Sequence, residues 1–245
     1  EMDDIGANLN AFTSKDCTCY YTKSVSSDLE KCVDLLSDLY FFSEFAEEEL
    51  EREKSVVIEE INMSEDTPDD VSQDAISAAL FKNQPLGQTI LGLPDNIKYC
   101  DRHSIKNYKE KHYIPYTVIS VAGNFDFAKL DKLVENYFET HFERMVAVLP
   151  ETEPKVTYTS EFVHRFKDIE QCHLEVAVGG CALNSSDRYA LSILSGILGG
   201  ATSSRLFQTI REKHGLVYSV YSYPSFYSNC GMLEIYAALS GSNIE

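Results

Sequence analysis

The sequence predicts an α+β fold, and three observations support that class. Segments with strand-like and helix-like patterns are mixed along the 245 residues, without the strict alternation of a parallel doubly-wound sheet. The apolar fraction is 44%, so a sizeable core is expected. A stretch at 148–156, with Pro150 and Pro154 among acids, has no periodicity and is typical of a linker. We therefore expect one domain over residues 1–150 and a second over 151–245.

The first domain is expected to open with strands and to continue mainly with helices. Residues 9–21 alternate and are rich in Thr, Tyr and Phe, which favours one strand or a pair of strands. The apolar run at 117–125 predicts a buried strand with a turn, and the Pro- and Gly-dense stretch at 82–97 predicts a loop. The helices predicted from apolar residues at helical spacing are 28–41, 46–64, 71–81, 104–113 and 127–142.

The second domain is expected to combine strands with helices around a Gly-rich turn at Gly199 and Gly200. Its predicted elements are the strands 173–180, 216–227 and 232–239 and the helices 187–198 and 203–213. The sequence starts without an initiator Met and ends without a closing helix, so we expect both domains to be incomplete.

Charge and cysteine usage narrow the class of protein. The net charge is −18, from 39 acidic and 21 basic residues, which argues against non-specific binding to nucleic acid or anionic membrane and is compatible with basic peptides. The sequence has no run of about 18 apolar residues that could form a membrane-spanning helix. Seven scattered Cys favour free thiols in a reducing compartment. We expect a cytoplasmic protein without nucleic-acid or membrane partners.

The helix at 46–64 carries two carboxylates of interest. Glu53 and Glu60 are seven residues apart, which places them about 20° from each other around a helix. Leu50, Val56, Val57 and Ile61 fall on the same broad side, so both carboxylates are expected among apolar neighbours. Such a group must be paired, protonated or metal-bound. From the residues alone, a Glu at the edge of the core paired with an Arg or Lys is the favoured interpretation.

Five segments, taken together and in order, resemble the family of pitrilysin, insulin-degrading enzyme and mitochondrial processing peptidase, in its bacterial members. They are LNAFTSKDCTCYY, ELEREKSVVIEEINMSEDTPDD, PLGQTILG, ISVAGNFD and SSRLFQTIREKHGLVYSVYSYPSFYSNCG. The resemblance implies two related α/β-sandwich domains of a metallohydrolase-like roll, and a zinc peptidase as the intact protein.

In that family two His of an inverted H-x-x-E-H helix and a later Glu hold zinc, and the Glu of the motif is the general base. The later Glu matches Glu60. Glu53 matches an acidic residue that does not bind the metal itself but orients the residues that do. The implied cofactor is zinc, whose bound water attacks the peptide. The motif itself is absent from this sequence, and only 59 residues precede Glu60. We therefore expect this chain alone to bind no zinc tightly and to cleave nothing.

The resemblance also implies roles for residues at both ends of the chain. Arg211 and Tyr218 match an R-x6-Y pair that holds the substrate backbone and stabilises the oxyanion, and Gly199-Gly200 matches a loop that touches substrate. From the residues alone, both are interpreted as structural, Arg211 as a helix-terminal charge and Tyr218 as an ordinary strand residue. In two-chain members the pair reaches the partner's site, so a homodimer is implied.

LNAFTS resembles the family's edge strand, to which an extended peptide adds by main-chain hydrogen bonds. The matching positions are Asn10, Ala11, Phe12 and Thr13. The predicted function of the intact protein is thus zinc-dependent endoproteolysis of unfolded or short peptides. Two alternatives remain open, a non-catalytic family member that serves as partner or scaffold, and a peptide-binding module.

Overall fold

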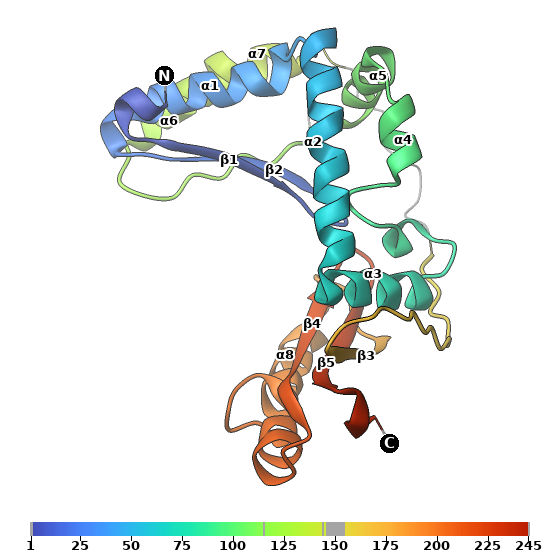
Figure 1. Cartoon of the computed structure of the whole chain (residues 1–245). Coiled ribbons are helices and arrows are strands. Elements are labelled where there is room, and N and C mark those ends of the chain that lie inside the picture. The colour runs from blue at the N-terminus through green and yellow to red at the C-terminus, as the bar shows by residue number, and fades with distance from the viewer. Residues whose placement is uncertain (1, 115, 144, 146–154, 245) are drawn as a thin grey trace. The chain divides into compact units, whose positions relative to one another are not determined.

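A computed structural model describes residues 2–114, 116–143, 145 and 155–244 (Figure 1). The chain forms two compact units, the first made of residues 1–56 and 95–151 and the second of residues 57–94 and 152–245. The predicted domain boundary near Glu151 lies outside the described residues and stays a prediction.

The first unit opens with a hairpin, as the alternation of residues 9–21 predicts. Strands β1 (Asn8–Thr13) and β2 (Thr18–Lys23) pair antiparallel, with Asn10 opposite Tyr21 and Thr13 opposite Thr18. Phe12 and Tyr21 add a diagonal aromatic contact across the pair, with ring centroids 6.3 Å apart. The prediction of a pair of strands is confirmed.

Helices supply the core of this unit. In chain order they are α1 (Leu29–Phe42), α4 (Pro94–Tyr99), α5 (Arg102–His112), and the continuous run α6 (Phe127–Val134), η4 (Glu135–Glu139) and α7 (Thr140–Phe142). Val33 of α1 packs on Leu133 and Phe138 of the last run, and the two helical segments lie side by side in Figure 1. Asp101 and Asp126 cap α5 and α6 by accepting backbone N–H bonds.

Two sequence predictions fail in the first unit. The stretch predicted as a loop contains helix α4, which begins at Pro94 because proline is favoured at a first helical position. Residues 117–125, predicted as a buried strand, form no strand, and Val118 is 86% exposed. A strand needs a hydrogen-bonding neighbour. In the described part of this unit only β1 and β2 are strands, and they pair with each other.

The second unit is built on an antiparallel sheet with strand order β3-β5-β4. Its strands are β3 (Gln171–Gly179), β4 (Val217–Phe226) and β5 (Gly231–Ser240), and its helical segments are α3 (Pro68–Leu80), α8 (Asp187–Gly199) and the π-type helix η5 (Phe207–Lys213). All five predicted elements of residues 173–239 are confirmed. Helices and strands are mixed in both units, so the predicted α+β class is confirmed.

The two faces of this sheet have different partners. Pairing places Glu175, Glu234 and Tyr236 on the face that contacts α3, and Ser222 on the face that contacts α8. Gly199 ends α8 directly against β4, where an added Cβ would lie 2.4 Å from the Ser222 nitrogen, so only glycine fits there. Within the described residues, the helices are all too short or too polar to cross a bilayer.

Candidate functional site

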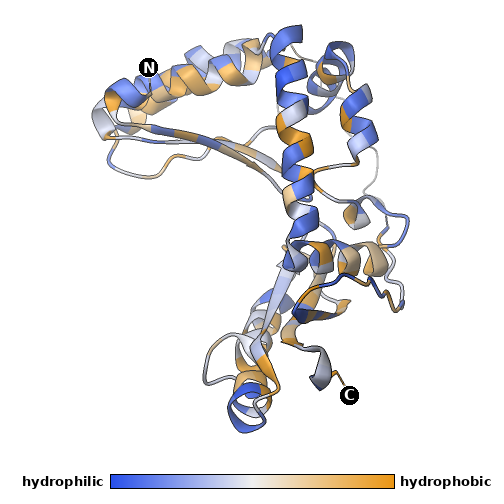
Figure 2. Ribbon diagram, viewed as in Figure 1, coloured by the Kyte–Doolittle hydropathy of each residue, from blue (hydrophilic) through white to orange (hydrophobic). Residues whose placement is uncertain are grey.

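The helix that carries the candidate metal ligand is α2 (Glu47–Asp66). The prediction of a helix over 46–64 is confirmed, and Glu53 and Glu60 therefore lie on nearly the same side of it. Their surroundings differ from the prediction. Both side chains are exposed, as is Val56 at 47%, and Ile61 is the single buried residue of the helix in this structure. Figure 2 shows a short hydrophobic band in the middle of α2 between hydrophilic ends.

The expectation that apolar neighbours enclose Glu53 and Glu60 is therefore wrong for this chain. The physical reason is that α2 has an apolar side, but the described residues do not cover it. Other acids of the helix form ion pairs, as Glu49 does with Arg52 and Glu51 with Lys54. Neither Glu53 nor Glu60 makes a hydrogen bond or ion pair with any described residue. Both are open carboxylates.

A zinc site needs three or four protein donors. Among the described residues, no group of three or more His, Cys, Asp or Glu side chains could hold a metal ion. Glu60 is one donor, and no described His accompanies it. The residues present therefore do not fit zinc on their own.

The predicted substrate strand is β1, and its residues Asn10, Ala11, Phe12 and Thr13 are all exposed. β2 occupies one edge of β1, and in the described structure no strand occupies the other edge. The Asn10 side chain bends back and accepts a hydrogen bond from the Ala11 N–H at 2.8 Å. The open edge offers main-chain donors and acceptors to an added extended chain.

Arg211 and Tyr218, which the family resemblance pairs, are in contact. Arg211 lies near the end of η5 and Tyr218 in β4, and the guanidinium carbon is 5.6 Å from the centroid of the Tyr218 ring. Phe207, one turn earlier, lies 4.8 Å from the same carbon. Two rings thus hold the cation, within the range of cation–π attraction. No described residue accepts a hydrogen bond from the guanidinium, although the chain has an excess of acids.

Phe207 was not singled out from the sequence. Its position four residues before Arg211 is the usable signal, since residues four apart on a helix are neighbours. Tyr218 is 72% exposed and Arg211 is half-buried, so solvent reaches both residues of the pair. The pair is suited to bind a carbonyl or carboxylate oxygen.

A polar cluster between α3 and the sheet was also missed. Asp69 Oδ1, on α3, lies 2.8 Å from His173 Nδ1. The same Asp69 oxygen accepts a hydrogen bond from the Tyr236 hydroxyl at 2.8 Å. Glu175 accepts from Ser72 at 3.0 Å, and Glu234 is fully buried beside it. The available signal is polar residues at alternate positions, His173-x-Glu175 and Glu234-x-Tyr236, in otherwise apolar strands.

This cluster makes the second unit sensitive to pH. Burial, aided by the negative charges of Glu234 and Asp69, raises the pKa of the Glu175 carboxyl to about 7, against a lowering effect of the Ser72 hydrogen bond. Folding therefore favours the protonated form. Its stabilisation is complete below the unfolded pKa of about 4.3 and is lost as pH rises towards 7. We expect the loss to be about 1–3 kcal/mol of unfolding free energy.

The prediction is checked by urea unfolding of the chain and of Glu175→Gln between pH 5 and 8. The chain has 15 Tyr and no Trp, so tyrosine fluorescence reports the transition. Glutamine cannot ionise, so the midpoint of Glu175→Gln should fall less with pH than that of the parent. Equal pH slopes in the two proteins would contradict the assignment of this titration to Glu175.

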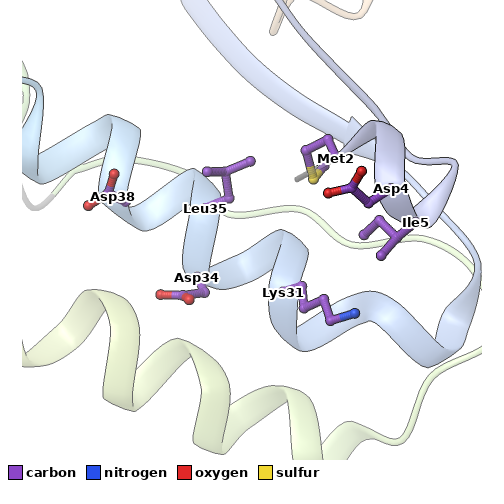
Figure 3. A pocket seen from close by; sticks show the side chains of 7 residues that line it. All are labelled: Met2, Asp4, Ile5, Lys31, Asp34, Leu35 and Asp38. Carbon is purple, nitrogen blue, oxygen red and sulfur yellow. The ribbon is translucent and has the colours of Figure 1, made fainter.

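A surface hollow lies elsewhere, between the 3-10 turn η1 (Asp3–Ile5) and α1 (Figure 3). It is lined by Met2, Asp4, Ile5, Lys31, Asp34, Leu35 and Asp38. None of the residues predicted to be functional lines this hollow.

Comparison with known proteins assigns the family. Residues 1–93 match the family described as insulinase (peptidase family M16), and residues 99–245 match the peptidase M16 inactive domain. The chain belongs to peptidase family M16, and the resemblance found from its sequence segments is confirmed.

Curated relatives carry zinc protease names. The uncharacterized zinc protease YmxG of Bacillus subtilis is 41% identical over 245 residues, which cover 100% of this chain and 59% of the relative. An uncharacterized zinc protease of Mycobacterium tuberculosis is 37% identical, over 97% of this chain and 55% of its own length. The chain thus spans less than two thirds of the curated relatives it matches.

Solved structures share the fold. A protease from Helicobacter pylori superposes with a TM-score of 0.88 at 21% identity, over 98% of this chain and 59% of that one. The peptidase M16 inactive domain from Pseudomonas fluorescens gives 0.83 at 20% identity, over 98% and 58%.

Proposed function

We propose that the intact protein is a zinc-dependent endopeptidase that cleaves unfolded or short peptides, with a metal-bound water as the nucleophile. Membership of family M16 and the zinc protease names of the relatives support this activity. In this proposal Glu60 is one of the zinc ligands and Glu53 orients the ligand set. The remaining donors and the general base belong to residues outside these 245.

The observation that carries the proposal is the contact between Arg211 and Tyr218. The chain has 39 acidic residues, yet among the residues that the structure describes the guanidinium of Arg211 contacts only the rings of Phe207 and Tyr218. Rings fix the orientation of the cation without consuming its N–H donors. Such a group is prepared to bind a peptide carbonyl and the oxyanion that develops from it.

The open edge of β1 supports peptide as the substrate class. An extended peptide beside Asn10–Thr13 would bond mainly through its backbone, so sequence preference would be weak. The net charge of −18 favours basic peptides. We further propose a cytoplasmic homodimer in which Arg211 and Tyr218 complete the partner's site.

The test compares this chain with the full-length gene product. Zinc content by elemental analysis and cleavage of an unstructured fluorogenic peptide are measured for both. We expect about one zinc per protomer and chelator-sensitive cleavage in the full-length protein, and neither in the 245-residue chain, because one carboxylate cannot retain zinc against competing chelators. A zinc-dependent hydrolysis rate from the 245-residue chain itself would contradict the proposal.

The alternative is a non-catalytic member that binds peptides or a partner subunit. The match of residues 99–245 to a domain described as inactive favours a supporting role for that half. Measurements on the full-length protein separate the two functions. A full-length scaffold would bind the peptide in calorimetry but would hold no zinc and would not cleave the peptide.

A further inference from the structure

The main-chain groups of β1 point alternately towards β2 and towards the open edge. The two strands pair in one unbroken register over Asn8–Thr13. One position further on, the Ser14 N–H donates to the Cys17 carbonyl oxygen at 2.8 Å, so this is a hydrogen-bonded pair. In an antiparallel ladder such pairs alternate with non-hydrogen-bonded pairs, whose N–H and C=O groups point away from the partner strand. The residues whose main-chain groups face the open edge are therefore Leu9, Ala11 and Thr13.

The side chain of Asn10 bonds to the donor at the centre of this edge. Its Oδ1 accepts a hydrogen bond from the Ala11 N–H at 2.8 Å. Because such a bond is close to linear, Asn10 Oδ1 lies on the open side of β1, in the direction of that N–H. No described strand occupies this edge. The side-chain oxygen thus lies on the side of β1 from which an added strand would offer its backbone carbonyl.

Asn8 shows that this bond belongs to one position and not to every asparagine of the strand. It is also exposed, and it lies two residues before Asn10, on the same face of β1. The Leu9 N–H that follows Asn8 points to the same open edge as the Ala11 N–H. The Asn8 side chain nevertheless makes no hydrogen bond with any described residue.

We propose that the Asn10 side chain competes with an extended peptide for the Ala11 N–H, and that a peptide carbonyl displaces it when the peptide adds to β1. The proposal rests on the proposed function, in which β1 is the peptide-binding edge. An uncovered strand edge is a template for pairing with other chains. A neutral bond at an exposed site covers the central donor of the edge, yet it is weak enough to be replaced. Asn10 therefore favours chains that offer several main-chain bonds in succession over those that offer a single bond.

The first measurement is the exchange of single backbone amides with water, read by NMR on the 245-residue chain. In Asn10→Ala we expect the Ala11 amide to exchange about 3- to 10-fold faster than in the parent, because it has lost its acceptor. Asn8→Ala is the matched control, since it makes the same change before the Leu9 amide at the same edge. The Leu9 rate in Asn8→Ala shows how the replacement itself affects the amide that follows, and it should stay near the parent rate.

The second measurement is the binding of a neutral, unstructured peptide to the same proteins by calorimetry. Asn10→Ala should bind the peptide about 2- to 5-fold more tightly, because no bond has to be displaced. Asn10→Asp keeps the acceptor and gives it a charge, which strengthens the bond to the Ala11 N–H, so it should bind the peptide about 2- to 5-fold more weakly. Asn8→Asp adds the same charge to the same face and should bind like the parent. A merely structural role of Asn10 would not give effects of opposite sign.

The outcomes separate this proposal from the function on which it rests. Weaker peptide binding in Asn10→Ala would overturn the proposal, because the side chain would then help to hold the peptide. A rise in Ala11 exchange no larger than the change at Leu9 in Asn8→Ala would also overturn it. If Ala11 exchange rises as expected but neither the parent nor any variant binds the peptide, the bond to Asn10 is confirmed, and the peptide-binding role of β1 in the proposed function is wrong.

Discussion

Replacing Glu60 by Gln in the full-length protein is expected to abolish stoichiometric zinc and to lower peptide cleavage by more than about 100-fold. The amide keeps the shape of the side chain but loses the charge that makes a carboxylate a zinc ligand. Glu60 makes no bond to a described residue, so the substitution leaves no internal partner unsatisfied. Zinc per protomer, measured by elemental analysis after dialysis, is the primary readout, and kcat/KM is the second.

Two further glutamates of α2 provide a control and a variant of intermediate effect. Glu59→Gln changes an exposed acid about 100° away around the helix and should leave both zinc content and cleavage unchanged. Glu53→Gln, on nearly the same side as Glu60, should cost about 10- to 100-fold in zinc affinity if it orients a ligand. Full zinc content and activity in Glu60→Gln would make Glu60 an ordinary surface carboxylate and leave the scaffold interpretation.

The elements that the sequence predicted correctly are those whose signal is local. The hairpin at 8–23 and the helices α1, α2 and α3 carry their periodicity within themselves. The same holds for β3, β4 and β5, where alternation matches the two faces of the sheet. Such patterns need no knowledge of the neighbours to be read.

The predictions that failed depend on neighbours. Residues 117–125 have strand composition, but no described strand pairs with them, so Val118 is exposed. Glu53 and Glu60 lie on the predicted side of α2, but no described residue covers that side. Periodicity gives the direction of a side chain within its element, whereas burial requires the opposing surface as well. Environment was therefore the part of the candidate site that sequence could not supply.

The cluster around Asp69 also could not be predicted from the sequence, because its residues are far apart along the chain. Asp69 and Tyr236 are 167 positions apart, and no spacing rule joins them. The contact of Arg211 with Tyr218 is the opposite case, because a helix end followed at once by a strand brings positions seven apart together. The roles of Asn10–Thr13, Glu53, Glu60, Arg211 and Tyr218 stay predictions.

Replacing Arg211 by Gln in the full-length protein is expected to lower kcat/KM by about 10²- to 10³-fold, which is the typical cost of removing one oxyanion donor. Zinc content should stay at the parent level, because Arg211 has no part in the ligand set. Tyr218→Phe should also reduce kcat/KM, since it removes the hydroxyl and keeps the ring on the guanidinium. Arg205→Gln is the matched control, an exposed arginine of the same segment without a ring contact among the described residues.

Substitution of Phe207 tests how much the orientation of the Arg211 guanidinium matters when its charge is kept. Phe207→Leu keeps an apolar side chain in the same turn but removes the ring 4.8 Å from the guanidinium. The cation–π contact is worth about 0.5–1 kcal/mol at an exposed site, so we expect only about a 2- to 5-fold fall in kcat/KM. Phe207→Tyr, which keeps the ring, should restore the parent value. A loss in Phe207→Leu as large as that in Arg211→Gln would mean that η5 itself is disturbed. No loss in Arg211→Gln would mean that the cation held between the two rings binds no substrate, and the peptidase proposal would lose the observation that carries it.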